Sequence, residues 1–337
     1  MFAEFMSWLD GTMRTRKINR CAHACGRLLM AFITTFGGTV RATTNDWLDT
    51  TMLKLEAMEF EFARGESDIP FIPVLSLGYK VYGKTEFVRE EGDVADSLSF
   101  RTQSASAYAM VPLYIGQRGL AVAVPYVGFT KFDFSRAEAE DQSVTAVYLP
   151  LGAAWQTEHG NQWGGFVMPS AYSPLSDSGE WVWSGMGGVL GRHLSGTRLV
   201  WYYGGVYDYA FSDGYFLPYL GFTYIYDPTW SFSVLAPWPA VSYAPSDRFF
   251  LRAGVAPSGA SWAIRQDGDE QQAISSFGGW DLGLWANWRI SRALWFALGS
   301  GVSGLRSLQV DTDGDATFDQ SLDSEPWISL TFSVRPQ

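Results

Sequence analysis

The sequence predicts an all-β protein, a single closed antiparallel barrel of about 12 to 14 strands that crosses a membrane. Three observations predict this fold. From about residue 53 onward, apolar and polar residues alternate with a period of two, in runs separated by turn residues. The connections between these runs alternate between short turns and longer acidic loops. The chain also contains 15 Trp, 16 Tyr and 23 Phe, and many of the Trp and Tyr fall near the ends of the runs.

The composition favours a membrane protein that crosses with strands. Of the 337 residues, 47% are hydrophobic and only 18% are charged, whereas soluble domains carry about 25% charged residues. No uncharged apolar stretch reaches the ~18 residues that a membrane-spanning helix requires. The net charge of −11 argues against nucleic acid as a partner, because phosphate binding depends on clustered basic residues.

The N-terminal region has the pattern of a targeting segment. A basic region that ends at Arg27 precedes a largely apolar stretch over residues 28–40, which is typical of a signal peptide. We therefore expect residues 1–42 to be a cleavable signal segment, 43–69 a lead-in that contains at most one strand, and 70–337 the barrel. Both cysteines, Cys21 and Cys25, lie in the signal segment, so the mature chain is expected to form no disulfide.

Fourteen runs are candidate strands, and their connections fall into two classes. The longer loops contain 19 Asp and Glu and no Lys or Arg. A barrel of the bacterial outer membrane has short periplasmic turns and long external loops, and only a closed sheet pairs all its backbone groups in lipid. Since 236–239 contains two prolines, the strands beside it are either one bent strand or two short ones, which leaves the count at 12 to 14. The candidate strands are 70–89, 98–115, 119–136, 142–157, 162–173, 181–193, 197–211, 215–226, 229–236, 239–245, 247–264, 278–290, 293–310 and 326–335, and the longer loops are 90–97, 137–141, 174–180, 212–214, 266–276 and 311–325.

Alternation within the runs predicts which residues face lipid and which face the lumen. In 280–288, one parity carries Leu282 and Leu284, and the other carries Asp281 and Asn287. We expect the first set to face lipid and the second to face the interior. The polar residues predicted to line the lumen and to tune its selectivity are Asp208, Asp281, Asn287 and Arg289.

Tryptophan near strand ends is typical of the boundary between hydrocarbon and water, where both its ring and its N–H group find suitable surroundings. The residues predicted to form this interfacial girdle are Trp201, Trp230, Trp280, Trp288, Trp295 and Trp327.

The stretches "YIYDPTWSFSVLAPWPAVSYAPSDRFFLRAG" (224–254) and "NWRISRALWFALGSG" (287–301) carry a family resemblance. With them, the chain resembles an uncharacterised family of Gram-negative outer-membrane β-barrel proteins. The resemblance implies a barrel over most of the mature chain, but no activity and no catalytic residues. The chain departs from the common barrel pattern at its end, "FSVRPQ", because Phe332 lies five residues before the terminus.

An acidic segment, "DTDGDATFD", is a candidate cation site. Its carboxylates alternate around a glycine and supply the hard oxygen ligands that suit Ca²⁺ or Mg²⁺. The match to a calcium loop is partial, and a solvated acidic loop is the alternative. No other cofactor is expected. The candidate ligands are Asp311, Asp313, Asp315 and Asp319.

The sequence does not favour an enzyme. The only arrangement of catalytic type is His193-Leu194-Ser195, which is similar to the His-x-Ser of outer-membrane lipid hydrolases. The predicted topology places it at a periplasmic turn, away from the outer leaflet. The expected role is therefore porin-like transport of small solutes, in contact with outer-membrane lipid and lipopolysaccharide after insertion by the barrel-assembly machinery. The alternatives are a transporter of hydrophobic ligands with a lateral opening near 236–245, and a non-transport barrel for adhesion, reception or envelope organisation.

Overall fold

The computed structural model is all-β and describes residues 68, 70, 72–91, 94–134, 142–158, 161–174, 181–209, 214–235, 238–265, 272–312 and 315–335. These residues contain no helix long and apolar enough to span a membrane. The strands are β1 (Leu75–Glu91), β2 (Val94–Ala109), β3 (Val111–Ile115), β4 (Gly119–Ala123), β5 (Tyr126–Phe134), β6 (Gln142–Tyr148), β7 (Leu151–Gln156), β8 (Gln162–Pro174), β9 (Val182–Ser195), β10 (Leu199–Tyr209), β11 (Tyr215–Ile225), β12 (Trp230–Leu235), β13 (Ala240–Ser246), β14 (Phe249–Arg265), β15 (Gln272–Arg289), β16 (Leu294–Thr312), β17 (Asp315–Leu322) and β18 (Glu325–Val334).

These strands form one closed antiparallel barrel whose wall has 14 strands. The pairs β2/β3, β4/β5 and β6/β7 are each one predicted strand, interrupted at Met110, at 124–125 and at 149–150. β17 and β18, separated at 323–324, pair with successive parts of β16 and likewise form one strand of the wall. Pro125 and Pro150 contribute to two of these breaks, because proline cannot donate to a strand ladder. β1 pairs with β18 from Leu75↔Val334 to Tyr82↔Trp327 and so closes the sheet. All 14 predicted strands are thereby found, at the upper end of the expected count.

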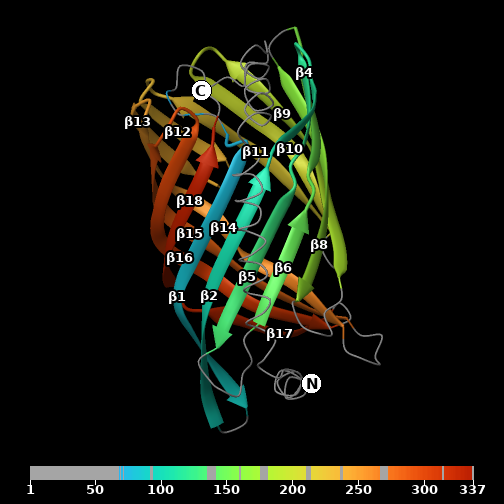
Figure 1. The fold of residues 1–337 in the computed structure, drawn as a ribbon. Helices are drawn as coiled ribbons and strands as arrows, with labels where there is room; N and C mark the ends of the chain where they lie inside the picture. The colour runs from blue at the N-terminus through green and yellow to red at the C-terminus, as the bar shows by residue number, and fades with distance from the viewer. Residues whose placement is uncertain are drawn as a thin grey trace, which may run out of the picture.

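The two ends of the barrel differ, and we call them the turn end and the hairpin end. Figure 1 shows the short connections at the end that also carries the described C-terminus, whereas β17 and the tip of β1–β2 lie at the opposite end. This arrangement confirms the prediction that the short turns and the longer connections lie at opposite ends of the barrel. The extent of the long loops was predicted wrongly, because β1–β2, β14–β15 and β16–β17 continue as paired strands through much of 90–97, 266–276 and 311–325. Barrel strands can stay hydrogen-bonded to each other beyond the part of the wall that faces lipid. A run of charged residues in the sequence therefore does not mark the end of strand pairing.

The side chains alternate as the sequence predicts. On β18, Ile328 and Leu330 are exposed on the outer face, whereas Ser329 and Ser333 are buried on the inner face. On β15, Leu282 and Leu284 are exposed. Large apolar side chains that alternate outward with inward polar ones are typical of a membrane barrel.

One stretch of the wall lacks a strand. β12 pairs with β11 only over Gly221–Ile225, and β13 pairs with β14 only up to Gly254. Within the described part of the chain, nothing pairs with the facing edges of β11 over 215–220 and of β14 over 256–265. We call this stretch the wall gap. β12 and β13 are therefore two short strands, and the prolines between them explain their early end.

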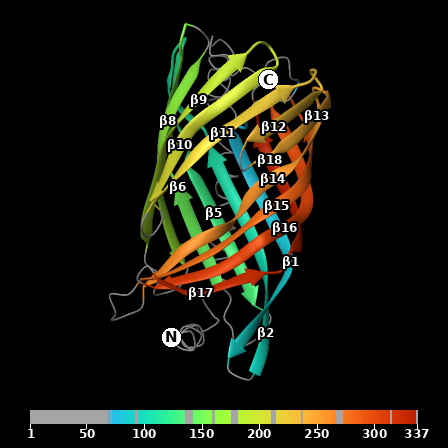
Figure 2. The same ribbon diagram turned by 180° about the vertical axis from the view of Figure 1, so that it is seen from behind.

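Across the barrel, β14 approaches β8, from which β9 to β13 separate it along the sheet. Figure 2 shows β14 to β17 leaning across the hairpin end towards β8. At the turn end, two described residues before β1 form backbone hydrogen bonds with different parts of the wall. The Asp68 amide donates to the Pro228 carbonyl (2.8 Å) between β11 and β12, and the Val74 amide donates to Val334 (2.8 Å) on the opposite side.

Candidate functional site

A buried ion pair joins two strands across the interior. Lys80 on β1 pairs with Asp281 on β15, and the Tyr82 hydroxyl donates to the same carboxylate oxygen (3.0 Å). Asp281 is 0% exposed, and β16 and β18 lie between β1 and β15 in the wall. A carboxylate removed from water in this way needs a cation and hydrogen bonds to remain charged, and Lys80 and Tyr82 provide them.

A second ion pair lies nearer the hairpin end. Arg306 on β16 pairs with Glu325 on β18, and both side chains are almost fully buried. Thr85 connects the two, since its hydroxyl donates to Glu325 (2.7 Å) and accepts from Arg306 Nη1 (2.8 Å). The Arg306 guanidinium also lies 4.8 Å from the centre of the Phe277 ring. We call the two ion pairs, with Tyr82 and Thr85, the lumen network.

Aromatic rings fill the space beside the lumen network. Phe277 on β15 lies 6.1 Å from Phe100 on β2 and 5.7 Å from Phe132 on β5, measured between ring centres. Trp285 and Trp327 contact each other with ring centres 5.2 Å apart. Packing among β1, β2, β5, β15 and β18 therefore occupies this part of the interior.

The four residues predicted to line the lumen do not form one site. Asp281 and Asn287 are buried inside the barrel, and Asp281 belongs to the lumen network. Arg289 instead pairs with Asp247 in a connection at the turn end (3.2 Å). Asp208, on the inward parity of β10, lies on a different part of the wall. Parity indicated the face of each residue, but it carried no information about contacts across the interior.

The tryptophans predicted to form the girdle divide into two groups. Trp201, Trp230 and Trp288 are partly exposed on the outer face. Trp295 and Trp327 are wrong assignments, because they are only 4% and 1% exposed and pack inside the barrel. Trp327 shares the parity of Ser329 and Ser333, so the alternation could have placed it inside. Trp295 shares the parity of Ser303, whereas the opposite parity carries Leu298 and Val302, so the same alternation could have placed it inside.

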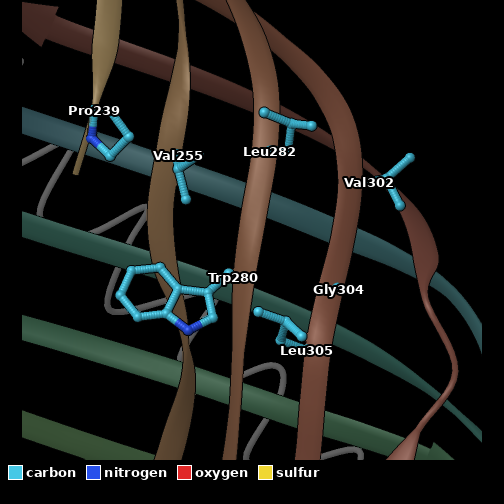
Figure 3. Close-up of a pocket in the computed structure, with 7 residues that line it drawn as sticks. All are labelled: Pro239, Val255, Trp280, Leu282, Val302, Gly304 and Leu305. Atoms are coloured by element: carbon cyan, nitrogen blue, oxygen red, sulfur yellow. The ribbon is translucent and has the colours of Figure 1, made fainter. Parts of the chain in front are cut away.

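Trp280, the remaining girdle candidate, lines an apolar groove on the outer wall (Figure 3). The groove has a volume of about 430 Å³ and lies beside the wall gap. Leu305 at its edge has a positive φ of 49° and is 86% exposed, although a non-glycine residue rarely adopts this conformation. We call it the outer groove, and it is lined by Pro239, Val255, Trp280, Leu282, Val302, Gly304 and Leu305.

The acidic segment predicted to bind a cation lies outside the described residues. Asp313 is not described, and neither are the side chains of Asp311, Asp315 and Asp319, although the backbones of these three belong to β16 and β17. Among the side chains that are described, no group of three or more His, Cys, Asp or Glu could hold a metal ion.

The His-x-Ser arrangement lies at the turn end, as the topology predicted. His193 is exposed near the end of β9, and its Nδ1 contacts the Asn161 side chain. Ser195 is the last residue of the same strand and is also exposed.

The chain resembles solved outer-membrane barrels, at low identity. An outer-membrane channel from Pseudomonas putida F1 is 10% identical over 79% of this chain and 97% of its own, with a TM-score of 0.40. The toluene transporter TodX from P. putida is 11% identical over 77% and 89%, with a TM-score of 0.37. The translocator domain of the autotransporter NalP from Neisseria meningitidis is 13% identical over 87% and 97%, with a TM-score of 0.31. No family model and no curated sequence matches the chain. The uncharacterised family indicated by the sequence therefore stays a prediction.

Proposed function

We propose that this chain is an outer-membrane β-barrel that lets small apolar molecules pass between the bilayer and the barrel interior through the wall gap. The outer membrane is proposed because it is the bacterial membrane in which closed barrels with short periplasmic turns occur. The turn end then faces the periplasm, and the acidic hairpins face outward.

The wall gap is the observation that carries the proposal. A complete barrel wall excludes lateral passage, because every strand is hydrogen-bonded to two neighbours. Between β11 and β14 that ladder is interrupted, and the exposed side chains on the β11 border include Phe216 and Leu220. The outer groove continues this apolar surface on the β14 side. An apolar molecule could therefore leave the bilayer there without separating two hydrogen-bonded strands.

The lumen network supports lateral over axial passage. It occupies part of the interior, and β14 approaches β8 at the hairpin end. A second candidate, porin-like diffusion of small polar solutes, is supported by one observation, which is that Arg252 on the inner face of β14 is exposed. Swelling of arabinose-loaded proteoliposomes tests this second candidate.

Lateral passage can be tested by cross-linking the two borders of the wall gap. Leu220 and Val255 each lie one residue beyond the last paired position, Gly221 on β11 and Gly254 on β14. In a Leu220→Cys/Val255→Cys variant, with Cys21 and Cys25 changed to Ser, bismaleimides of increasing length would bridge the gap. We expect bridging to reduce the entry of the apolar dye N-phenylnaphthylamine into cells to the level of cells without the barrel.

The matched control is Leu284→Cys/Ser300→Cys. These residues are register partners in the intact wall between β15 and β16, so the same reagent bridges them without affecting the gap. Dye entry that persists after bridging at Leu220 and Val255, or that falls equally in the control, would contradict lateral passage.

A further inference from the structure

A basic patch lies on the outer face of the wall, where β1, β2 and β5 pair side by side (Figure 1). Lys84 on β1 is the register partner of Arg101 on β2, and both side chains are exposed. Lys131 on β5 is the partner of Gln103, two residues from Arg101. Directly opposite side chains lie about 5 Å apart and diagonal ones about 7–8 Å apart. The three cations, which we call the rim patch, are therefore close enough to contact one phosphate group.

A β-bulge directs Lys84 outward. Lys80 and Tyr82 point into the barrel, so simple alternation along β1 would place Lys84 inside as well. Between Val81 and Lys84, however, β1 advances by three residues while β2 advances by two. The extra residue exchanges the two faces of the strand. Thr85 therefore joins the lumen network, whereas Lys84 lies on the outer face.

The rim patch lies at the border of the apolar outer wall. Towards the turn end, the outward positions of the same strands carry exposed apolar and aromatic side chains, such as Tyr79 and Val127. Towards the hairpin end, β5 continues with Asp133. On β9 and β10, the exposed side chains at the hairpin end are instead aromatic, namely Trp183 and Tyr209. Among the described side chains, outward cations at this end are thus confined to β1, β2 and β5, where an apolar surface meets a charged one.

The carboxylates beside the rim patch leave its central arginine without an ion pair. Lys84 pairs with Glu86 (2.9 Å), and both side chains are exposed. Lys131 pairs with Asp133. Arg101 forms no ion pair with any described side chain. It lies directly opposite Lys84, and like charges in this position destabilise a sheet, so an anion bound at Arg101 would be stabilising.

We propose that the rim patch binds a phosphate group of lipid A, the membrane anchor of lipopolysaccharide, in the outer leaflet. Phosphate oxygens accept charge-assisted hydrogen bonds from guanidinium and ammonium groups, and exposed ion pairs such as Lys84–Glu86 are weak enough to be exchanged for them. A lipid is the ligand because the patch borders the apolar wall, so that acyl chains can cover Tyr79 and Val127 while the head contacts the cations. The inference rests on the proposed outer-membrane orientation and is independent of lateral passage.

The test is native mass spectrometry of the purified barrel with hexa-acylated lipid A that carries two phosphates. We expect this lipid to bind about tenfold more tightly than dephosphorylated lipid A with the same acyl chains, and inorganic phosphate not to displace it. Arg101→Gln/Lys131→Gln is expected to weaken binding about 25-fold, because each basic side chain beside an anionic lipid surface contributes about fivefold. Arg118→Gln/Arg248→Gln is the matched control, because it removes two exposed cations from connections at the turn end.

Asp133→Asn is a second variant, whose effect has the opposite sign. It removes the carboxylate that pairs with Lys131 and that would repel a bound phosphate. Lipid A is therefore expected to bind about two- to fivefold more tightly, which is the contribution of an exposed ion pair. A gain in affinity cannot result from misfolding, and heat-modifiable mobility on gels verifies that each variant is folded.

Each other outcome overturns the proposal. Equal binding of dephosphorylated lipid A would show contact through acyl chains alone, and displacement by inorganic phosphate would show a plain anion site. Unchanged binding in Arg101→Gln/Lys131→Gln, an equal loss in Arg118→Gln/Arg248→Gln, or no gain in Asp133→Asn would show that the rim patch does not hold the phosphate. None of these results bears on dye entry through the wall gap, so the two proposals can fail separately.

Discussion

Removing the carboxylate of Glu325 tests the lumen network most directly. In the folded barrel this carboxylate pairs with Arg306 and accepts a hydrogen bond from Thr85. Glu325→Ala leaves the Arg306 guanidinium buried, with hydrogen bonds only to Thr85 Oγ1 and to the Asp323 carbonyl (3.1 Å). A buried charge without its counter-ion destabilises the folded state, whereas neutral acceptors offset only part of the loss.

The magnitude follows from which contacts remain. Breaking a buried ion pair from one side costs about 3–5 kcal/mol. Because two hydrogen bonds and the Phe277 ring still contact Arg306, we expect the lower end, a loss of about 3 kcal/mol in the free energy of unfolding. That loss lowers the folding equilibrium constant about 100-fold, at 1.4 kcal/mol for each factor of ten.

The assay is reversible urea unfolding of the barrel in short-chain phosphatidylcholine vesicles, followed by tryptophan fluorescence. Lys84→Ala is the control, because Lys84 and Glu86 form an exposed ion pair that contributes about 0–1 kcal/mol. An Arg306→Met/Glu325→Leu variant removes both charges and is expected to stay within about 1 kcal/mol of the parent, since apolar replacements of a buried pair are often neutral. The reasoning fails if Glu325→Ala costs no more than Lys84→Ala, or if the double variant loses as much as the single one.

Four further substitutions test the wall, the first three of them by the same unfolding assay. Leu284→Arg on the outer face is expected to cost about 2–4 kcal/mol and Ile290→Arg near the turn end about 0–1 kcal/mol, and equal costs would contradict the membrane position. Leu305→Gly is expected to raise the free energy of unfolding by about 1 kcal/mol, because it relieves a positive φ of 49°, and a loss would show that the exposed side chain contributes more than the strain. Gly301→Val is expected to yield no folded barrel, as judged by heat-modifiable mobility on gels, because a Cβ there would lie 2.0 Å from the Leu282 carbonyl, and a folded product would refute the close approach.

Local chemistry determined the wall of this protein. Fourteen runs of alternating residues became the 14 strands, because alternation, turn residues and proline act within a few residues of one another. Leu282 and Leu284 faced outward, and Asp281 and Asn287 faced inward, for the same reason. The sorting of short turns and longer connections to opposite ends also follows from the sequence, since antiparallel strands alternate in direction.

The interior and the wall gap were decided only by the tertiary structure. Lys80 and Asp281 are far apart in the sequence and meet because the sheet closes and brings β1 near β15. Arg335, just after β18, was not singled out beforehand, because it has no local motif and reaches the Phe250 ring on β14 only through closure of the sheet. Prolines predicted the end of β12, but the gap exists because β11 and β14 continue beyond it. Strand parity sets the face of each residue, whereas sheet closure and strand length determine which residues meet across the lumen and where the wall is incomplete.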